Sequence, residues 1–135
     1  MLSGKERRQL LAEFRKAQAG EMAALRHRHQ LELRELKASQ DARRKEWKET
    51  ENNKRRQLFQ TEAKKSTERR AYFADRNARW EAFNRILTDE LSQRKNEQDA
   101  RVSALEEQQK SALKEFQDSL GRGERPSARL WPGSR

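Results

Sequence analysis

The sequence is organised around the segment FRKAQAGEMAALRHRHQLELREL (residues 14–36), in which Phe14, Leu25 and Leu36 stand eleven residues apart. The same spacing continues along the chain through Trp47, Leu58, Arg69, Trp80, Leu91, Val102 and Leu113. Eleven residues fill three turns of an α-helix at about 3.67 residues per turn, so these side chains fall on one narrow stripe. A stripe this thin cannot enclose a core of its own, and it needs another surface to lie against.

The composition argues against a compact globular domain. Only 32% of the 135 residues are hydrophobic and 40% are charged, whereas an ordinary domain has about 45–50% apolar residues. High charge with low hydrophobicity also occurs in disordered chains. Here, however, no proline precedes Pro126, and Gly20 is the only glycine between Gly4 and Gly121. This scarcity of helix breakers, combined with a helical period, predicts a long helix.

The predicted fold is all-α. It has an N-terminal cap at residues 1–4, one long, nearly straight, coiled-coil-like helix over about residues 5–120, and a flexible tail over residues 121–135. Ser3 and Glu6 fit a capping box at the helix start. The glycines of the segment Gly121-Arg122-Gly123 suit the left-handed conformation that often ends a helix.

The alternative fold is a two-helix hairpin with a turn near residues 51–54. The segment Glu51-Asn52-Asn53-Lys54 is the most turn-like part of the long helical pattern. The eleven-residue phase nevertheless runs unbroken from Trp47 to Leu58, and a sharp turn would not need to preserve it. This continuity favours the single helix.

The charge is strongly and unevenly basic. The net charge is +10, residues 1–60 carry 16 basic and 9 acidic side chains, and residues 86–120 carry 5 and 8. A basic front and a mildly acidic rear favour an anionic partner or antiparallel self-association. Acidic protein surfaces and nucleic acid both meet this requirement. A membrane surface is not expected, because such binding needs a broader apolar face than this stripe provides.

No motif for chemistry emerges from the sequence. The chain has no cysteine, and its two histidines, His27 and His29, are two residues apart and point to different sides of a helix. A shared metal would need histidines three or four residues apart. No apolar run approaches the roughly 18 residues of a membrane span. We therefore expect neither an enzyme nor a metal or other cofactor.

The candidate binding residues combine apolar anchors with arginine, the mixture that dominates protein–protein hot spots. The alternative role for the aromatic members is a core between two helices. The candidates are Phe14, Leu25, Leu36, Trp47, Tyr72, Phe73, Arg76, Arg79, Trp80, Phe83, Leu87 and Leu91.

Two similar runs carry a resemblance to known proteins. Glu6-Arg7-Arg8-Gln9-Leu10-Leu11 and Lys54-Arg55-Arg56-Gln57-Leu58-Phe59 resemble, in composition, the Arg/Glu/Gln-rich helices of the trichohyalin–plectin-homology type. Similar helices occur in microtubule-associated proteins and in microtubule inner proteins of cilia. The resemblance implies a helix lying along a filament wall, with tubulin as an acidic partner, in the cytoplasmic cytoskeleton or the ciliary axoneme. The same texture resembles the Arg-rich helical tails of plasmid mobilisation relaxases, which implies a role linked to DNA.

The leading functional hypothesis is a non-enzymatic structural or scaffold protein, an extended helix that docks along a larger protein assembly and staples its components. The first alternative is a basic helix that binds nucleic acid, and the resemblance to relaxase tails implies a link to plasmid mobilisation. The second is a homodimeric coiled coil that buries the stripe against its own copy.

Overall fold

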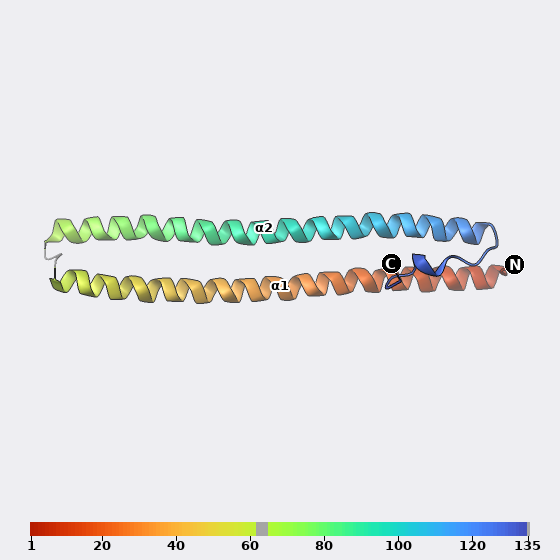
Figure 1. Ribbon diagram of the computed structural model, residues 1–135, viewed down its shortest axis with the longest axis horizontal. Coiled ribbons are helices and arrows are strands. Elements are labelled where there is room, and N and C mark those ends of the chain that lie inside the picture. The colour runs from red at the N-terminus through yellow and green to blue at the C-terminus, as the bar shows by residue number, and fades with distance from the viewer. Residues whose placement is uncertain (62–64, 135) are drawn as a thin grey trace. The chain divides into compact units, whose positions relative to one another are not determined.

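The computed structural model describes residues 1–61 and 65–134 and is all-α (Figure 1). Helix α1 runs over Gly4–Thr61 and helix α2 over Ser66–Gly121, and a short 3-10 helix, η1, covers Ala128–Leu130. The two long helices pack against each other as a helical hairpin. The chain divides into two compact units, which are described separately below. We name the units by their order in the sequence: the outer unit comprises the two terminal segments, Met1–Leu31 and Asn96–Arg135, and the inner unit comprises the central segment, Glu32–Lys95.

The prediction of one continuous helix over residues 5–120 is wrong, because α1 ends at Thr61 and α2 begins at Ser66. The hairpin alternative has the observed topology, but its turn near residues 51–54 is also wrong, since this segment lies inside α1. A local signal for the second helix is present in the sequence. Hydroxyl residues Ser66 and Thr67 and the acidic Glu68 occupy its first turn, where such side chains are favoured.

The apolar stripe finds its partner surface within the same chain. In the inner unit, Trp47 of α1 packs against Trp80 and Phe83 of α2, with ring centroids 4.9 and 5.9 Å apart. In the outer unit, Phe14 of α1 stacks on Phe116 of α2 at 4.1 Å. The eleven-residue repeat thus builds the contact between α1 and α2, and an external partner is not needed to cover it.

Glutamines at the helix–helix contact set the register of the outer unit: Gln18 and Gln98 are buried, and Gln109 is half-buried. The amide of Gln18 donates to the backbone carbonyl of Gln109 at 2.9 Å, and the amide of Gln109 donates to the carbonyl of Gln18 at 2.8 Å. Eleven residues away on each helix, Gln98 donates to the carbonyl of His29 at 3.0 Å. A helical carbonyl can accept this second bond because it has two lone pairs.

The inner unit has the same type of hydrogen bond, from a glutamine amide to a backbone carbonyl of the facing helix. Gln40 is 2% exposed and donates to the backbone carbonyl of Leu87 at 2.8 Å. Gln40 stands eleven residues after His29, and Leu87 stands eleven residues before Gln98. A buried amide without a partner would destabilise the fold by about 1–3 kcal/mol. These bonds therefore favour one alignment of the two helices.

The outer unit holds a small core to which the C-terminal segment contributes. Trp131 lies edge-on to Phe14 and Phe116, with centroids 5.2 and 5.6 Å away, and Leu130 is 4% exposed. The sequence predicts a flexible tail here, whereas the structure packs this segment against α1 and α2. The buried members are Phe14, Ala112, Phe116, Leu120 and Leu130, with Leu2, Leu10, Leu11, Leu113 and Trp131 packed around them.

The start of α1 and the end of α2, which both belong to the outer unit, are capped by local hydrogen bonds. Ser3 and Glu6 form the expected capping box, each side chain accepting from the other residue's backbone amide at 3.1 and 3.2 Å. At the end of α2, the amide of Gly123 donates to the carbonyl of Leu120 at 2.9 Å, and that of Glu124 to Ser119 at 3.0 Å. This is a Schellman cap, and Gly123 adopts its left-handed conformation with φ 72°.

Replacing Gly123 with alanine should lower the free energy of unfolding by at least about 1–2 kcal/mol, the cost of a left-handed non-glycine residue. A Cβ at this position would also lie 2.8 Å from Cγ of Met1. Gly121→Ala is the matched control, because nothing lies within 4 Å of its Cβ position. We expect Gly121→Ala to leave stability unchanged or to raise it, as measured by urea unfolding followed by circular dichroism. Equal effects of the two changes would contradict this account of the cap.

Candidate functional site

The structure places most of the predicted binding residues inside the hairpin. Phe14 and Leu87 are fully buried. Of the twelve candidates, only Phe73, with 39% of its surface exposed, and Arg79 are exposed. The half-buried candidates are Leu25, Leu36, Trp47, Tyr72, Arg76, Trp80, Phe83 and Leu91. For the aromatic residues Trp47, Trp80 and Phe83, the alternative role as a core between two helices matches their observed contacts.

The exposed Phe73 belongs to a group of three rings in the inner unit, which we call the aromatic triad: Phe59, Tyr72 and Phe73. The ring centroids lie 5.6 Å apart for Phe59 and Tyr72, 5.8 Å for Phe59 and Phe73, and 5.6 Å for Tyr72 and Phe73. All three contacts are edge-to-face, with interplanar angles of 73°, 82° and 74°. The triad joins the last turns of α1 to the second turn of α2.

Arginines lie over the aromatic rings of the inner unit. The guanidinium carbon of Arg69 is 5.0 Å from the Phe59 centroid, and that of Arg79 is 5.9 Å from the Tyr72 centroid. Arg76 lies over Trp47 at 5.7 Å. Such cation–π contacts contribute about 0.5–1 kcal/mol at exposed sites. They help to hold these arginines over the rings.

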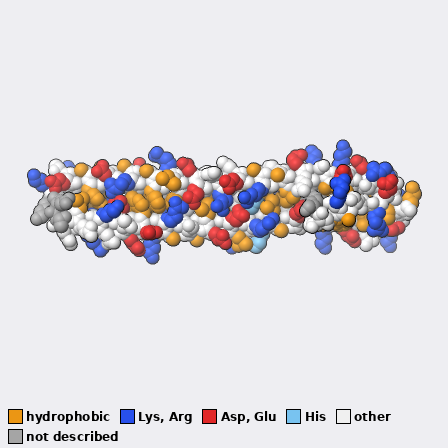
Figure 2. Space-filling view, viewed as in Figure 1, with side chains coloured by type: hydrophobic (Ala, Val, Ile, Leu, Met, Phe, Trp, Pro, Cys, Tyr) orange, Lys and Arg blue, Asp and Glu red, His pale blue; other side chains and the backbone are white. Residues whose placement is uncertain are grey.

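The surface around the triad is strongly cationic. Residues 54–59 and 65–76 carry seven lysines or arginines and two acidic side chains. Among the residues that the structure describes, the side chains of Arg55, Arg56 and Arg70 form no hydrogen bond or ion pair. On the face of the molecule shown in Figure 2, basic and acidic side chains are interspersed around an apolar seam.

A buried carboxylate, that of Glu51, holds the triad member Tyr72 in place. Glu51 is 4% exposed, and its side chain accepts two hydrogen bonds from the guanidinium of Arg79, at 2.9 and 3.2 Å. The hydroxyl of Tyr72 donates to the same carboxylate at 3.0 Å and to the backbone carbonyl of Glu51 at 3.2 Å. Hydrogen bonds from Arg79, and then from Tyr72, lower the pKa of Glu51 in spite of its burial. Burial and the bond to Glu51 raise the pKa of Tyr72.

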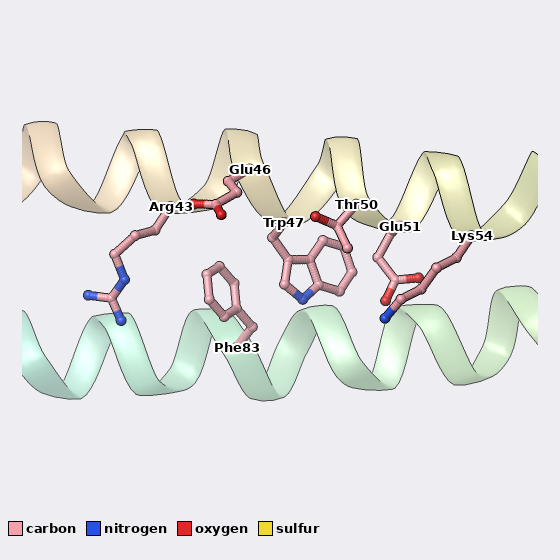
Figure 3. Close-up of a pocket in the computed structure, with 7 residues that line it drawn as sticks. All are labelled: Arg43, Glu46, Trp47, Thr50, Glu51, Lys54 and Phe83. Atoms are coloured by element: carbon pink, nitrogen blue, oxygen red, sulfur yellow. The ribbon is translucent and has the colours of Figure 1, made fainter.

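A hollow of about 280 Å³ lies beside this network in the inner unit (Figure 3). Trp47 from α1 and Phe83 from α2 point toward one another across it. Two of its four charged groups are already paired, because Arg43 donates to Glu90 at 3.0 and 3.2 Å and Glu51 is held by Arg79. We do not assign this hollow a function. The lining residues are Arg43, Glu46, Trp47, Thr50, Glu51, Lys54 and Phe83.

Within residues 1–61 and 65–134, no three histidine, cysteine, aspartate or glutamate side chains gather in a way that could hold a metal ion. His29 is 7% exposed and its Nε2 has no hydrogen-bond partner among these residues, while His27 is exposed. The same part of the chain contains no helix with a segment long and apolar enough to cross a membrane.

Comparisons with protein-family models, with curated proteins and with solved structures find no match to this chain. The function is therefore inferred from the exposed Phe73 of the aromatic triad and from the cationic side chains near it.

Replacing Glu51 with glutamine should reduce the free energy of unfolding at pH 7 by about 1–2 kcal/mol, because charge-assisted hydrogen bonds to Arg79 are lost. Since the folded-state pKa of Glu51 lies below the ordinary value of 4.5, its contribution is fully present above that value. It is lost as the pH falls through the lower, folded-state pKa. The difference between wild type and Glu51→Gln in urea unfolding should thus shrink from pH 7 to pH 3.

The control is Glu49→Gln, which removes an exposed carboxylate two residues away. We expect it to change stability by less than about 0.5 kcal/mol at either pH. A Glu51→Gln effect that stayed constant between pH 7 and pH 3 would show that the carboxylate charge is not what stabilises the hairpin.

Proposed function

We propose that this chain is a non-enzymatic structural protein whose helical hairpin binds an acidic protein surface within a larger assembly. The observation that carries the proposal is the exposed cationic and aromatic surface of the inner unit. There, Phe73 is 39% exposed and Arg55, Arg56 and Arg70 form no ion pair with a described residue. Arginine and aromatic side chains are enriched at protein–protein hot spots.

The packing of the hairpin supports a binding role for the outer faces of the helices. The eleven-residue stripe is covered by helix–helix contacts such as Trp47 against Trp80 and Phe14 against Phe116. The proposal therefore differs from docking through that stripe, because Phe73 and the three arginines Arg55, Arg56 and Arg70 lie outside it. The same packing gives no support to the homodimeric coiled coil, which would need the stripe to be free.

A cytoskeletal filament is the assembly that we favour. The resemblance of residues 6–11 and 54–59 to trichohyalin–plectin-homology helices supports this choice, and tubulin offers an acidic surface that complements the net charge of +10. The setting would then be the cytoplasmic cytoskeleton or a ciliary axoneme.

Nucleic acid is the second candidate, and the unpaired arginines favour it as well. Arg55 and Arg56 lie on α1, and Arg70 lies on α2. Binding of this kind would be tolerant of sequence and would weaken steeply with salt, because each neutralised phosphate releases counterions.

The proposal predicts that the full chain co-sediments with polymerised tubulin. The double change Arg55→Gln/Arg56→Gln should weaken this binding by about three- to tenfold, because two cations that could pair with carboxylates are removed. Arg15→Gln/Lys16→Gln is the matched control, since it removes two exposed cations from the outer unit. We expect the control to weaken binding by less than about twofold.

A gel-shift titration with duplex DNA of arbitrary sequence, at two salt concentrations, separates the two candidates. Tighter binding to the duplex than to tubulin, with a steep loss at higher salt, would replace the structural role with the nucleic-acid role. If Arg55→Gln/Arg56→Gln and Arg15→Gln/Lys16→Gln weakened tubulin binding equally, the binding surface could not be assigned to the inner unit.

A further inference from the structure

We infer that the aromatic triad and its flanking arginines form a docking site for an acidic segment of a partner protein that also carries a large apolar side chain. The inference rests on the proposed function and specifies its partner. The triad supplies the contact for the apolar side chain, and the surrounding arginines supply the contacts for its acidic neighbours.

The first support is the exposure of a ring that already belongs to an ordered cluster. Phe73 keeps 39% of its surface exposed although its ring contacts both Phe59 and Tyr72. By contrast, Phe14 and Phe116 in the outer unit are fully buried. A ring that is held in place and partly open to solvent can bury further apolar area when a partner side chain packs against it.

The second support is that the site is ordered before a partner binds. The hydroxyl of Tyr72 is tied to the buried Glu51 at 3.0 Å, and Glu51 is in turn held by Arg79. The guanidinium of Arg69 lies over Phe59. Fixed groups lose little conformational entropy on binding, so more of the contact energy appears as affinity.

The third support is charge complementarity. Lys54, Arg55 and Arg56 on α1, and Arg69, Arg70 and Arg76 on α2, are near the triad in sequence, where only Glu68 and Asp75 oppose them among residues 54–59 and 65–76. Such a surface attracts carboxylates and repels cationic segments. A purely apolar segment would offer no carboxylate to Arg55, Arg56 and Arg70, which form no ion pair with a described residue, so the fitting segment is acidic and apolar together.

The ring geometry favours a protein side chain over single-stranded nucleic acid. Bases bind on aromatic faces that are free to stack. The three rings of the triad lie at interplanar angles of 73–82° to one another, and Arg69 covers a face of Phe59. This arrangement forms no row of parallel rings for successive bases.

The test compares two fluorescein-labelled probes of similar length, poly-glutamate and a glutamate–tyrosine copolymer, in anisotropy titrations with the full chain. We expect the copolymer to bind about tenfold more tightly, a gain typical of one apolar anchor. Phe73→Ser should abolish this preference. Ile86→Ser is the matched control, because Ile86 is an apolar residue of α2 with 60% exposure that lies outside the triad, and it should retain the preference.

Two further variants separate loss of the site from loss of the fold. Phe73→Leu keeps an apolar side chain and should retain about a third of the preference, with the same urea unfolding midpoint as wild type. Arg55→Gln/Arg56→Gln should weaken both probes about equally and leave their ratio unchanged.

Each alternative outcome has a definite meaning. If poly-glutamate and the copolymer bind equally, or if Ile86→Ser loses as much preference as Phe73→Ser, the triad is not the docking site, although the proposed function stands. If neither probe binds, both the site and the proposed acidic partner are wrong. If oligothymidine binds more tightly than the copolymer and Phe73→Ser removes that binding, the occupant is nucleic acid and the inference is overturned.

Discussion

The hydrogen bonds from buried and half-buried glutamine amides to backbone carbonyls of the facing helix are the constraint on which the packing depends. A narrow apolar stripe tolerates several alignments, because leucines and alanines can slide past one another at little cost. The amides of Gln18, Gln40, Gln98 and Gln109 each find a backbone carbonyl across the hairpin. In an alignment shifted by a few residues, the buried amides of Gln18, Gln40 and Gln98 would lose their partners, and each would cost about 1–3 kcal/mol.

A shift by a full eleven residues is not excluded by the glutamines alone, since the columns repeat at that interval. The individual side chains remove this ambiguity. Phe14 stacks on Phe116 and Trp47 packs against Trp80, and an eleven-residue shift would part both pairs. The ion pair of Glu51 with Arg79, at 2.9 Å, would also be broken and would leave a carboxylate buried. Repetition thus provides the continuous contact, and a few unlike residues select one register.

The helical content and the eleven-residue phase of the apolar side chains could be predicted from the sequence, whereas the position of the break that makes the hairpin could not. The eleven-residue spacing correctly indicates that Asn52 and Asn53 are helical, because Trp47 and Leu58 stay in phase across them. The same spacing continues from Leu58 to Arg69, on the two sides of the break between α1 and α2. A period states which face of a helix is apolar, but not whether the covering surface belongs to another molecule. Arg69, the one charged member of the stripe, is the sign that the stripe is interrupted there.

The candidate site was predicted in part. Tyr72, Phe73, Arg76 and Arg79 were selected from their residue types. Tyr72 and Phe73 belong to the triad and Arg79 lies over Tyr72, whereas Arg76 lies over Trp47. Phe59 was missed because it lies one residue off the stripe. Glu51 was missed because an acidic residue among lysines and arginines has no feature in sequence that marks it as buried. Its partners Tyr72 and Arg79 are 21 and 28 residues away, so only the folded hairpin brings the three together.

The aromatic clusters of the two units differ in how far they are exposed to solvent, and this difference bears on where a partner binds. In the outer unit, the chain's own C-terminal segment supplies Trp131 and Leu130, and Phe14 and Phe116 are fully buried. In the inner unit, no described segment beyond the two helices packs on the triad, and Phe73 keeps 39% exposure amid arginines. Covering an aromatic cluster requires apolar side chains, as the C-terminal segment demonstrates for the outer unit. By the same physical requirement, an apolar side chain on an acidic segment is what the triad lacks.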